Sequence, residues 1–318
     1  MLVPVLLFIL GFLLLIKGGD WFVDGASDIA HRFKVPELLI GATVVSIGTT
    51  LPEVMVSASA AVSGHGEIAY GNAIGSVICN AALICGLTCA VRPTKVDAKT
   101  FRVPVIFFFI AAVMYMVFAY GFGEFSRTAG LALLLVFVIY MIITVKQAVG
   151  HSVQAEKTEA EGSFGREVLL LVLGAAAIAV GARLLVDNGT KIAEALGVPE
   201  SVIALTFVAL GTSLPELVTA ITALAKGHSA LSLGNVIGAN LFNLVLVSGL
   251  SAALAPFPVP GSKTIAGLNS SLVVDIPVMM LVMCLLAIPA LTKKKLTRPQ
   301  GITLLLIYAA FCVYQFVL

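Results

Sequence analysis

Long apolar runs, separated by short polar segments, follow one another along the whole 318-residue chain. A membrane-spanning helix needs about 20 mostly apolar residues, and ten stretches meet that requirement. One longer polar stretch, GHSVQAEKTEAEGSFG, divides them five and five. The pattern predicts an all-α polytopic membrane protein with spans at 3–31, 36–63, 68–90, 102–121, 127–147, 166–195, 199–226, 230–254, 271–291 and 299–317.

The two groups of five spans repeat each other. Residues 18–87 align with residues 181–250 without a gap, and roughly 27 of the 70 paired positions are identical, which is the internal symmetry expected of transporters built from repeats. Because each repeat contains five spans, the second one enters the membrane from the opposite side. We therefore expect two inverted transmembrane repeats, at 1–149 and 166–318, joined by a linker at 150–165.

Composition and charge refine this picture. Hydrophobic residues make up 59% of the chain and charged residues 11%, against roughly 25% charged residues in soluble domains. The net charge of +2 is too small to indicate a nucleic-acid partner. The loops after odd-numbered spans hold fourteen Lys and Arg residues and the other loops hold three. Since short cytoplasmic loops carry the excess of basic residues, we expect a cell-membrane protein with a cytoplasmic linker and two external termini.

The candidate chemistry begins with two copies of one motif, GTTLPE at 48–53 and GTSLPE at 211–216. Proline cannot donate a backbone hydrogen bond, and glycine loosens the backbone, so we expect broken helices in spans 2 and 7. Hydrocarbon tolerates a break only where the freed backbone groups line a cavity or bind something. Glu53 and Glu216 follow the two prolines. A carboxylate inside a membrane is costly and is functional by default.

Spans 3 and 8 carry a second pair of motifs, GNAIGSVICN at 71–80 and GNVIGANLFN at 234–243. Small residues allow close helix contacts and make a broken helix plausible here too, and each motif ends in an asparagine, Asn80 or Asn243. Carboxylate, amide, hydroxyl and carbonyl oxygens without histidine or cysteine are the ligands that Ca²⁺ or Na⁺ prefers, and they do not suit zinc or copper. Inverted repeats bring both sets together near the membrane midplane.

Other ionisable residues have simpler explanations. Glu37 and Glu200 begin spans, where helix capping is the expected role. His65 and His228 fall in loops and are expected to be solvated or capping. Four aspartates occupy the second halves of spans 1 and 6, where they either face water near the helix ends or line an ion path: Asp20, Asp24, Asp28 and Asp187.

With these paired motifs, essentially the whole chain resembles the cation/calcium exchanger superfamily, and specifically its short prokaryotic Na⁺/Ca²⁺ antiporters. The resemblance implies ten helices, an ion-binding core, and two long tilted helices, spans 1 and 6, that slide to alternate access. It also implies secondary active exchange of Na⁺ for Ca²⁺, with no enzymatic activity and no cofactor. The partners implied are the two ions and the lipid bilayer, with no protein partner.

The resemblance also implies roles for single residues. Glu53 and Glu216 correspond to the central Ca²⁺ ligands that Na⁺ shares. The other expected contributors are the carbonyls of Thr49 and Thr212, the hydroxyls of Thr50 and Ser213, the carbonyls of Ser46 and Ala209 at flanking Na⁺ sites, and the polar side chains of Ser76, Asn80 and Asn243.

Two departures from the family pattern bear on the mechanism. Ala239 stands where many members have serine, which removes one potential Na⁺ ligand. Asn243 stands where the K⁺-dependent branch carries aspartate. Proton-coupled relatives usually have an acidic residue at the positions of Asn80 and Asn243, so Na⁺ is favoured as the counter-ion, with H⁺/Ca²⁺ exchange as the alternative. An intramembrane hydrolase using Glu53 and Glu216 as acid and base is disfavoured, because the sequence shows no nucleophile with an orienting base.

Overall fold

The structure, a computed structural model, describes residues 2–154, 163–196, 211–261 and 263–317. Within these ranges, eight helical segments are long and apolar enough to cross a membrane: Leu2–Arg32, Glu37–Val62, Gly66–Val91, Ala98–Phe122, Arg127–Gly150, Phe164–Ala195, Ser229–Leu254 and Ser271–Thr292. Two further helices are α10 (Leu214–Ala225), which is short and apolar, and the 20-residue α14 (Arg298–Val317). The span expected at 199–226 is therefore described only from residue 211 onward.

Three of the long helices are regular, and the others combine α-helical pieces with π-helical turns. The regular helices are α1 (Leu2–Arg32), α7 (Arg127–Gln154) and α8 (Phe164–Ala195). The composite ones are α2 (Glu37–Ile40), η1 (Gly41–Val45) and α3 (Ser46–Val62); α4 (Gly66–Ile78), η2 (Cys79–Ile84) and α5 (Cys85–Val91); α6 (Ala98–Met116) and η3 (Val117–Phe122); α11 (Ser229–Phe242), η5 (Asn243–Val247) and α12 (Ser248–Leu254); and η6 (Ser271–Asp275) and α13 (Ile276–Thr292).

The expected helix breaks need correction in three of the four spans. Helix α3 continues through Pro52, and the helices of spans 3 and 8 continue through Asn80 and Asn243 as π-helical turns. Membrane helices can accommodate such irregularities by local π-helical adjustment and by contacts with neighbouring helices. In the second copy, residues 211–213 form a turn before α10 begins at Leu214. The helix of span 5 also reaches Gln154, into the expected linker.

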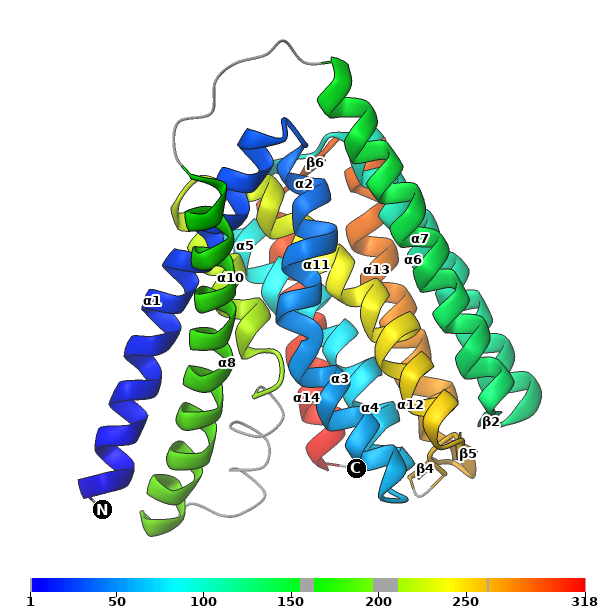
Figure 1. The fold of residues 1–318 in the computed structure, drawn as a ribbon. Coiled ribbons are helices and arrows are strands. Elements are labelled where there is room, and N and C mark those ends of the chain that lie inside the picture. Colours follow the sequence, from blue (N-terminus) through cyan, green and yellow to red (C-terminus); the bar gives the residue numbers. More distant parts are fainter. Residues whose placement is uncertain (1, 155–162, 197–210, 262, 318) are drawn as a thin grey trace.

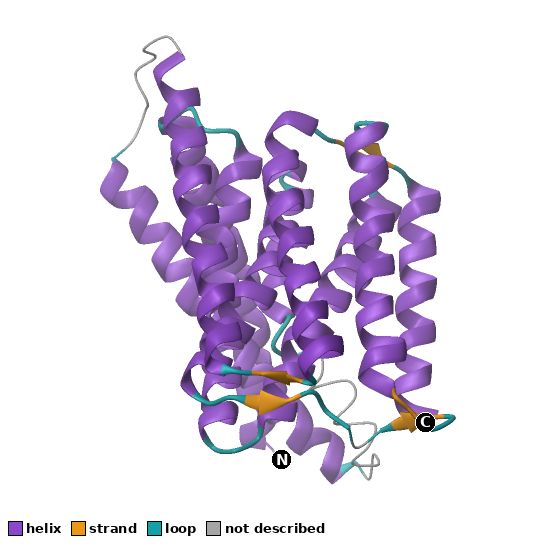
Figure 2. Cartoon of the chain, turned by 90° about the vertical axis from the view of Figure 1, so that its right-hand side faces the viewer, coloured by secondary structure: helices purple, strands orange, loops and turns teal. Residues whose placement is uncertain are grey.

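The fold is not purely helical, because three short antiparallel ribbons lie at the ends of the bundle (Figure 2). Strand β1 (Thr94–Lys95) pairs with β6 (Lys295–Leu296), and β2 (Glu124–Phe125) pairs with β3 (Phe257–Pro258). Each of these two ribbons joins a loop of the first half to a loop of the second. The third is a local hairpin of β4 (Thr264–Ile265) and β5 (Leu268–Asn269).

Helices α1 and α8 lie side by side and form one flank of the molecule (Figure 1). Glycines allow this contact. A Cβ atom added at Gly11 would lie 2.8 Å from the carbonyl oxygen of Gly181, and one added at Gly181 would lie 2.8 Å from that of Gly11. Arg32 of α1 also forms a bidentate ion pair with Glu167 of α8, with the shortest N···O distance 2.6 Å. The two long helices thus pack on each other along their length.

The remaining helices interleave the two halves of the chain. Helix α14 packs on α5, where a Cβ at Gly301 would lie 2.5 Å from the amide nitrogen of Ala90. Helix α7 packs on α12 in the same way, because a Cβ added at Gly130 would lie 2.5 Å from the amide nitrogen of Ala253. Because Ala90 and Ala253 are paired positions of the sequence repeat, the same contact is made twice. Apolar side chains from both halves therefore share one large core.

Candidate ion-binding site

Two glutamates from the two copies of the GT(T/S)LPE motif are fully buried. Glu53 lies on α3 and Glu216 in the first turn of α10, and both have 0% exposure. The two carboxyl groups are close enough to interact electrostatically. Glu216 Oε1 accepts a hydrogen bond of 3.4 Å from Thr50 Oγ1. Within the described chain, the other three carboxylate oxygens have no hydrogen-bond partner.

Proline explains why these glutamates can serve a site in the middle of helices. Pro52 has no N–H, so the carbonyl oxygen of Gly48, four residues earlier, loses its usual helical donor. Pro215 occupies the first turn of α10, where the missing N–H costs nothing. Glu216 follows in the same turn, where the positive end of the helix dipole favours a carboxylate. The first motif thus places an acidic side chain one turn after a carbonyl that lacks its usual helical donor, and the second places one in the N-terminal turn of a helix.

The two asparagines at the ends of the second motifs are also fully buried. Asn80 lies in the π-helical turn η2, and Asn243 opens η5. Both have 0% exposure, and neither amide has a hydrogen-bond partner in the part of the chain that is described. Buried amides are nearly always hydrogen-bonded. Two symmetric amides without partners among the described residues, in π-helical turns of the kind that often mark functional sites, therefore mark a candidate binding site.

The expected hydroxyl ligands are those of Thr50, which donates to Glu216, and Ser213, whereas Ser46, Thr49 and Thr212 are expected to contribute carbonyls. Ser213 is buried and its Oγ has no partner among the described residues, as expected of a group that faces a ligand. Ser76 is buried on α4. The side chains of Ser46, Thr49 and Thr212 are instead engaged in hydrogen bonds within the protein. Ala209 lies outside the described residues.

Two asparagines that the sequence reasoning missed hold these hydroxyls. Thr49 Oγ1 donates to Asn235 Oδ1 at 3.1 Å, and Thr212 Oγ1 donates to Asn72 Oδ1 at 3.1 Å. Both asparagines are the second residue of the GN(A/V)IG motifs, identical in the two copies. This identity between the two copies could have marked both asparagines as site residues. An asparagine next to a glycine in an apolar helix, however, is also typical of a position where helices pack closely.

Three of the four aspartates of the long helices form ion pairs with basic residues, and Asp187 also lines the cavity next to the site. Asp20 and Asp24 form ion pairs with Lys226 at 3.3 and 2.8 Å. Asp187 pairs with Arg183 on the same helix. Glu37, expected to be a helix cap, has its Oε1 2.7 Å from Nδ1 of His228. These groups tie elements together near the ends of the bundle.

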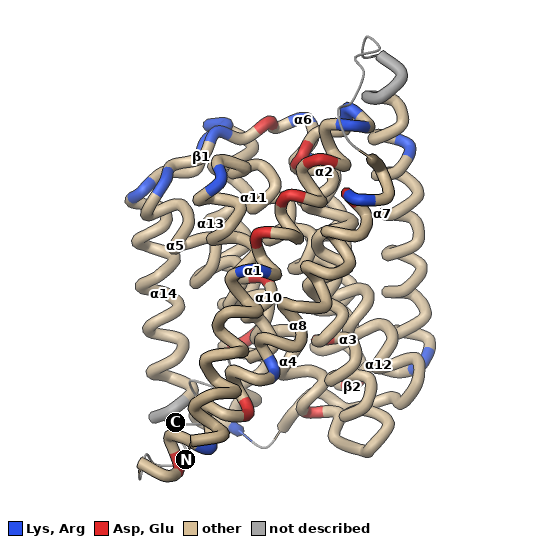
Figure 3. The backbone as a smooth tube through the Cα atoms, turned by 60° about the vertical axis from the view of Figure 1, so that its left-hand side comes forward, with Lys and Arg blue, Asp and Glu red and all other residues tan. Residues whose placement is uncertain are grey.

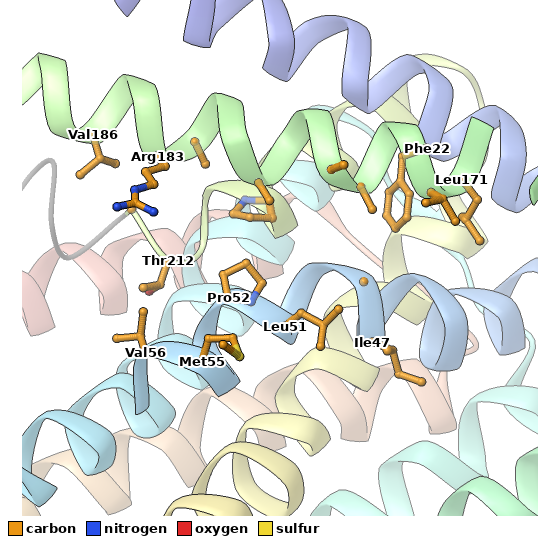
Figure 4. A pocket seen from close by; sticks show the side chains of 18 of the residues that line it. Phe22, Ile47, Leu51, Pro52, Met55, Val56, Leu171, Arg183, Val186 and Thr212 are labelled. Carbon is orange, nitrogen blue, oxygen red and sulfur yellow. The ribbon is translucent and has the colours of Figure 1, made fainter. Parts of the chain in front are cut away.

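An apolar cavity of about 910 Å³ separates α8 from α3 next to the site. Figure 4 shows Leu51, Pro52 and Met55 on one side and residues of α8 on the other, with Arg183 at one end. Thr212 and Pro215 also line it, so it reaches both copies of the motif. Within the described ranges, no group of three or more His, Cys, Asp or Glu side chains is arranged to hold a metal ion. The oxygen atoms available to an ion here come from two carboxylates, amides, hydroxyls and backbone.

The profile of the family described as sodium/calcium exchanger protein matches residues 3–146 and 166–317. The chain belongs to this family. It is 32% identical to the sodium/calcium exchanger MaX1 of Methanosarcina acetivorans, with 98% of each chain covered. It is 36% identical, over 80% of its length and 81% of the relative, to the inner membrane protein YrbG of Escherichia coli.

Among solved structures, one of the sodium-calcium exchanger NCX_Mj, soaked with Na⁺ and Sr²⁺, superposes with a TM-score of 0.83 at 36% identity and 98% coverage of both chains. The protein is therefore a multi-pass membrane cation/Ca²⁺ exchanger whose membrane-spanning elements are helices, and it is a transporter and not an enzyme. The ions exchanged by the family are Na⁺ and Ca²⁺.

Proposed function

We propose that this protein couples Na⁺ movement to Ca²⁺ movement in the opposite direction, by alternating access to one site built around Glu53 and Glu216. The observation that carries the proposal is the set of three fully buried oxygens on these two glutamates that have no hydrogen-bond partner among the described residues. A buried carboxylate without a partner is very costly. Two carboxylates and one Ca²⁺ form a neutral site, so a divalent cation removes that cost.

The residues around the glutamates support the same assignment. Asn80 and Asn243 supply amide oxygens, and Ser213 supplies a hydroxyl, all without other partners in the described chain. Because the hydroxyls of Thr49 and Thr212 are directed to asparagines, we assign their backbone carbonyls to the ions. As the resemblance implies, the flanking Na⁺ sites use the carbonyls of Ser46 and Ala209. Thr50 adds a hydroxyl, and Ser76 adds polar lining.

Inverted repeats are part of the proposal, with the halves at 1–149 and 166–318. The cross-packing of α14 on α5 and of α7 on α12 supports it, because the same glycine contact occurs once in each direction. The ribbons β1–β6 and β2–β3 support it too, since each pairs a loop of one half with a loop of the other. The turn at 211–213 and the π-helical turns η2 and η5 carry residues of the proposed site, Ser213, Asn80 and Asn243, which supports the assignment.

The orientation proposed places the basic end of the molecule in the cytoplasm. Lys and Arg residues gather at one end of the bundle, and the described ends of the chain lie at the other (Figure 3). Cytoplasmic loops of membrane proteins carry the excess of basic residues. The linker at 150–165 is then cytoplasmic and both termini are external.

The test is ⁴⁵Ca²⁺ uptake into vesicles that contain the purified protein. An outward Na⁺ gradient is expected to drive uptake, and a pH gradient of equal size is not. Uptake driven by the pH gradient and indifferent to Na⁺ would establish H⁺/Ca²⁺ exchange instead. Uptake driven by neither gradient would contradict the proposed exchange altogether.

A further inference from the structure

We propose that Asn72 and Asn235 are positioning residues, which hold the two ion-binding motifs in place by hydrogen bonds across the boundary between the two halves. Asn72 belongs to α4 in the first half and takes the hydroxyl of Thr212 in the second. Asn235 belongs to α11 in the second half and takes the hydroxyl of Thr49 in the first. The inference rests on the proposed function, because it concerns the geometry of that same site.

Each threonine is well placed to transmit such a constraint. Thr49 precedes Glu53 by one helical turn on α3, and Thr50 next to it donates to Glu216. Thr212 precedes Glu216 by the same number of residues, in the turn that leads into α10. Tying the threonine hydroxyl to an asparagine fixes the orientation of the peptide that carries the threonine carbonyl. It also fixes the turn from which the glutamate projects.

Asparagine suits this task because its amide offers both an acceptor and donors. Asn72 uses both. Its Oδ1 accepts from Thr212, while its Nδ2 donates to Ser57 Oγ at 2.8 Å and to the carbonyl oxygen of Glu53 at 3.3 Å. One side chain thereby connects α4, α3 and the turn before α10. It holds the backbone of one glutamate and the motif of the other.

Asn235 is bound differently, although it occupies the paired position of the repeat. Its Oδ1 accepts from Thr49 and, at 3.4 Å, from Ser46. Its Nδ2 is buried at 0% exposure and has no partner within the described residues. The reason is visible in the sequence: Ala220 stands where the first half has Ser57. Asn235 therefore holds α3 but has no hydrogen bond to α10.

This difference predicts unequal roles. Loss of the Asn72 amide frees both motifs, since it contacts the Glu53 backbone and Thr212 together. Loss of the Asn235 amide frees the Thr49 side only. Misplaced ligands weaken ion binding, so the half-saturating ion concentration is the quantity that changes. A substitution that only lowers the amount of folded protein reduces the maximal rate and leaves that concentration unchanged.

The experiment is a set of double-mutant cycles in the reconstituted full-length protein, with initial rates of Na⁺-driven ⁴⁵Ca²⁺ uptake measured at varied Na⁺ and varied Ca²⁺. The correct pairs are Asn72→Ala with Thr212→Val, and Asn235→Ala with Thr49→Val. The matched controls are the crossed pairs, Asn72→Ala with Thr49→Val and Asn235→Ala with Thr212→Val. Valine keeps the shape of threonine and removes the hydroxyl.

We expect Asn72→Ala and Thr212→Val each to raise the half-saturating Na⁺ concentration by about fivefold or more. The double variant should raise it no further than the stronger single variant does, because groups in direct contact show such non-additivity. In the crossed pairs, whose residues share no hydrogen bond, the fold-increases of the two single variants are expected to multiply. Ser57→Ala is expected to reproduce part of the Asn72→Ala effect, whereas Ala220→Ser is expected to leave the half-saturating concentrations within about twofold.

Several results would overturn the inference while leaving the proposed function intact. Wild-type half-saturation in Asn72→Ala, or effects in the correct pairs that multiply like those in the crossed pairs, would show that the asparagines only pack. If Asn72→Ala does not fold, the inference is tested with Thr212→Val and Ser57→Ala. Unchanged half-saturating ion concentrations in both of these variants would contradict the positioning role. Absence of Na⁺-driven uptake in the wild-type protein contradicts the proposed function itself.

Discussion

The long helices α1 and α8 occupy paired positions of the repeat, yet they meet the site differently. Helix α1 touches α10 closely: a Cβ at Gly19 would lie 2.8 Å from Thr222 Oγ1 and 2.9 Å from Val218 Cγ1. Lys226, just after α10, reaches back to Asp20 and Asp24 on α1. Between α8 and part of α3 lies the apolar cavity of about 910 Å³. The same kind of junction is closed and ion-paired on one side and open on the other.

The residues at these junctions explain the difference. The repeat pairs Gly19 with Ala182, Asp20 with Arg183, and Lys226 with Ser63. The second junction therefore has neither the close-contact glycine nor the ion pairs between elements, and Arg183 pairs with Asp187 on its own helix. The motifs that build the ion site are nearly identical in the two halves, while the contacts to the long helices are not. The two halves therefore contribute nearly the same motifs to the site but contact the long helices differently.

The largest effect is expected where the two halves agree. Glu53→Gln and Glu216→Gln should each reduce Ca²⁺ exchange at least about 100-fold, because either change leaves a divalent cation undercompensated in a desolvated site. Both variants should fold, as judged by their elution in detergent. Glu124→Gln, an exposed carboxylate on β2, is the control and should transport normally. Transport by one of the two buried variants would show that the glutamates are not equivalent.

A smaller effect is expected from filling the two junctions. Gly19→Val places atoms against Thr222 and Val218, and overpacking of this kind costs about 1–3 kcal/mol, so we expect a lower thermal midpoint and about tenfold slower exchange. The paired substitution, Ala182→Val, adds atoms beside the cavity and should change the midpoint little. Equal losses of thermal stability and rate in Gly19→Val and Ala182→Val would mean that the cavity does not have room for the added atoms of the larger side chain on α8.

Reversing the charge of Lys226 tests the ion pairs that close the first junction. Partial burial opposes its ammonium, but hydrogen bonds to Asp24 and Asp20 hold the pKa of Lys226 above its usual value. A raised pKa means that Lys226 keeps its charge up to a higher pH than a free lysine does. The contribution of the pairs should therefore not change between about pH 6 and 9, and it is lost at the alkaline end as the pH rises through the raised pKa. Lys226→Glu replaces attraction with repulsion, and we expect a two- to fivefold change in rate, modest because these groups are partly exposed.

The control for Lys226→Glu exchanges the two charges, so that the basic residue lies on α1 and the acidic residue follows α10. Asp24→Lys in the Lys226→Glu background should bring the rate back toward wild type, and Arg183→Ala, at the junction without ion pairs between elements, should have little effect. Uptake rates of the three variants, measured at one Na⁺ gradient, decide the matter. A double variant as slow as Lys226→Glu alone would assign its effect to something other than the ion pairs.

The smallest functional effect is expected from two exposed serines that report orientation. Ser163→Cys, at the start of α8, should react with a membrane-impermeant thiol reagent only from the cytoplasmic side, and Ser63→Cys, after α3, only from outside. Both should transport normally, and the parent protein is the labelling control. In the proposed orientation, Lys226 and the closed junction lie toward the cytoplasmic side, because Lys226 is in the loop after span 7. The reverse labelling pattern would place this junction toward the external side.

The membrane location, most of the helices and the identity of the buried glutamates followed from the sequence alone. Apolar runs of membrane-spanning length have few alternatives to helices in hydrocarbon, because every backbone polar group must be paired within the protein. The predicted breaks were less accurate: Pro52 lies inside a continuous α3. Local sequence gives the missing donor at a proline but not the neighbouring contacts that let the helix continue.

Only the tertiary structure decided which polar groups meet across the two halves. The hydroxyls of Thr49 and Thr212 stand in the motif beside the glutamates, but their partners, Asn235 and Asn72, are more than a hundred residues away. The sequence repeat does show that Lys226, Gly19 and Ser57 lack identical counterparts. It cannot show that the first two close one junction or that the third completes the bonds of Asn72. Hydrogen bonds and ion pairs depend on distances of a few ångströms, which only the packing of helices from both halves sets.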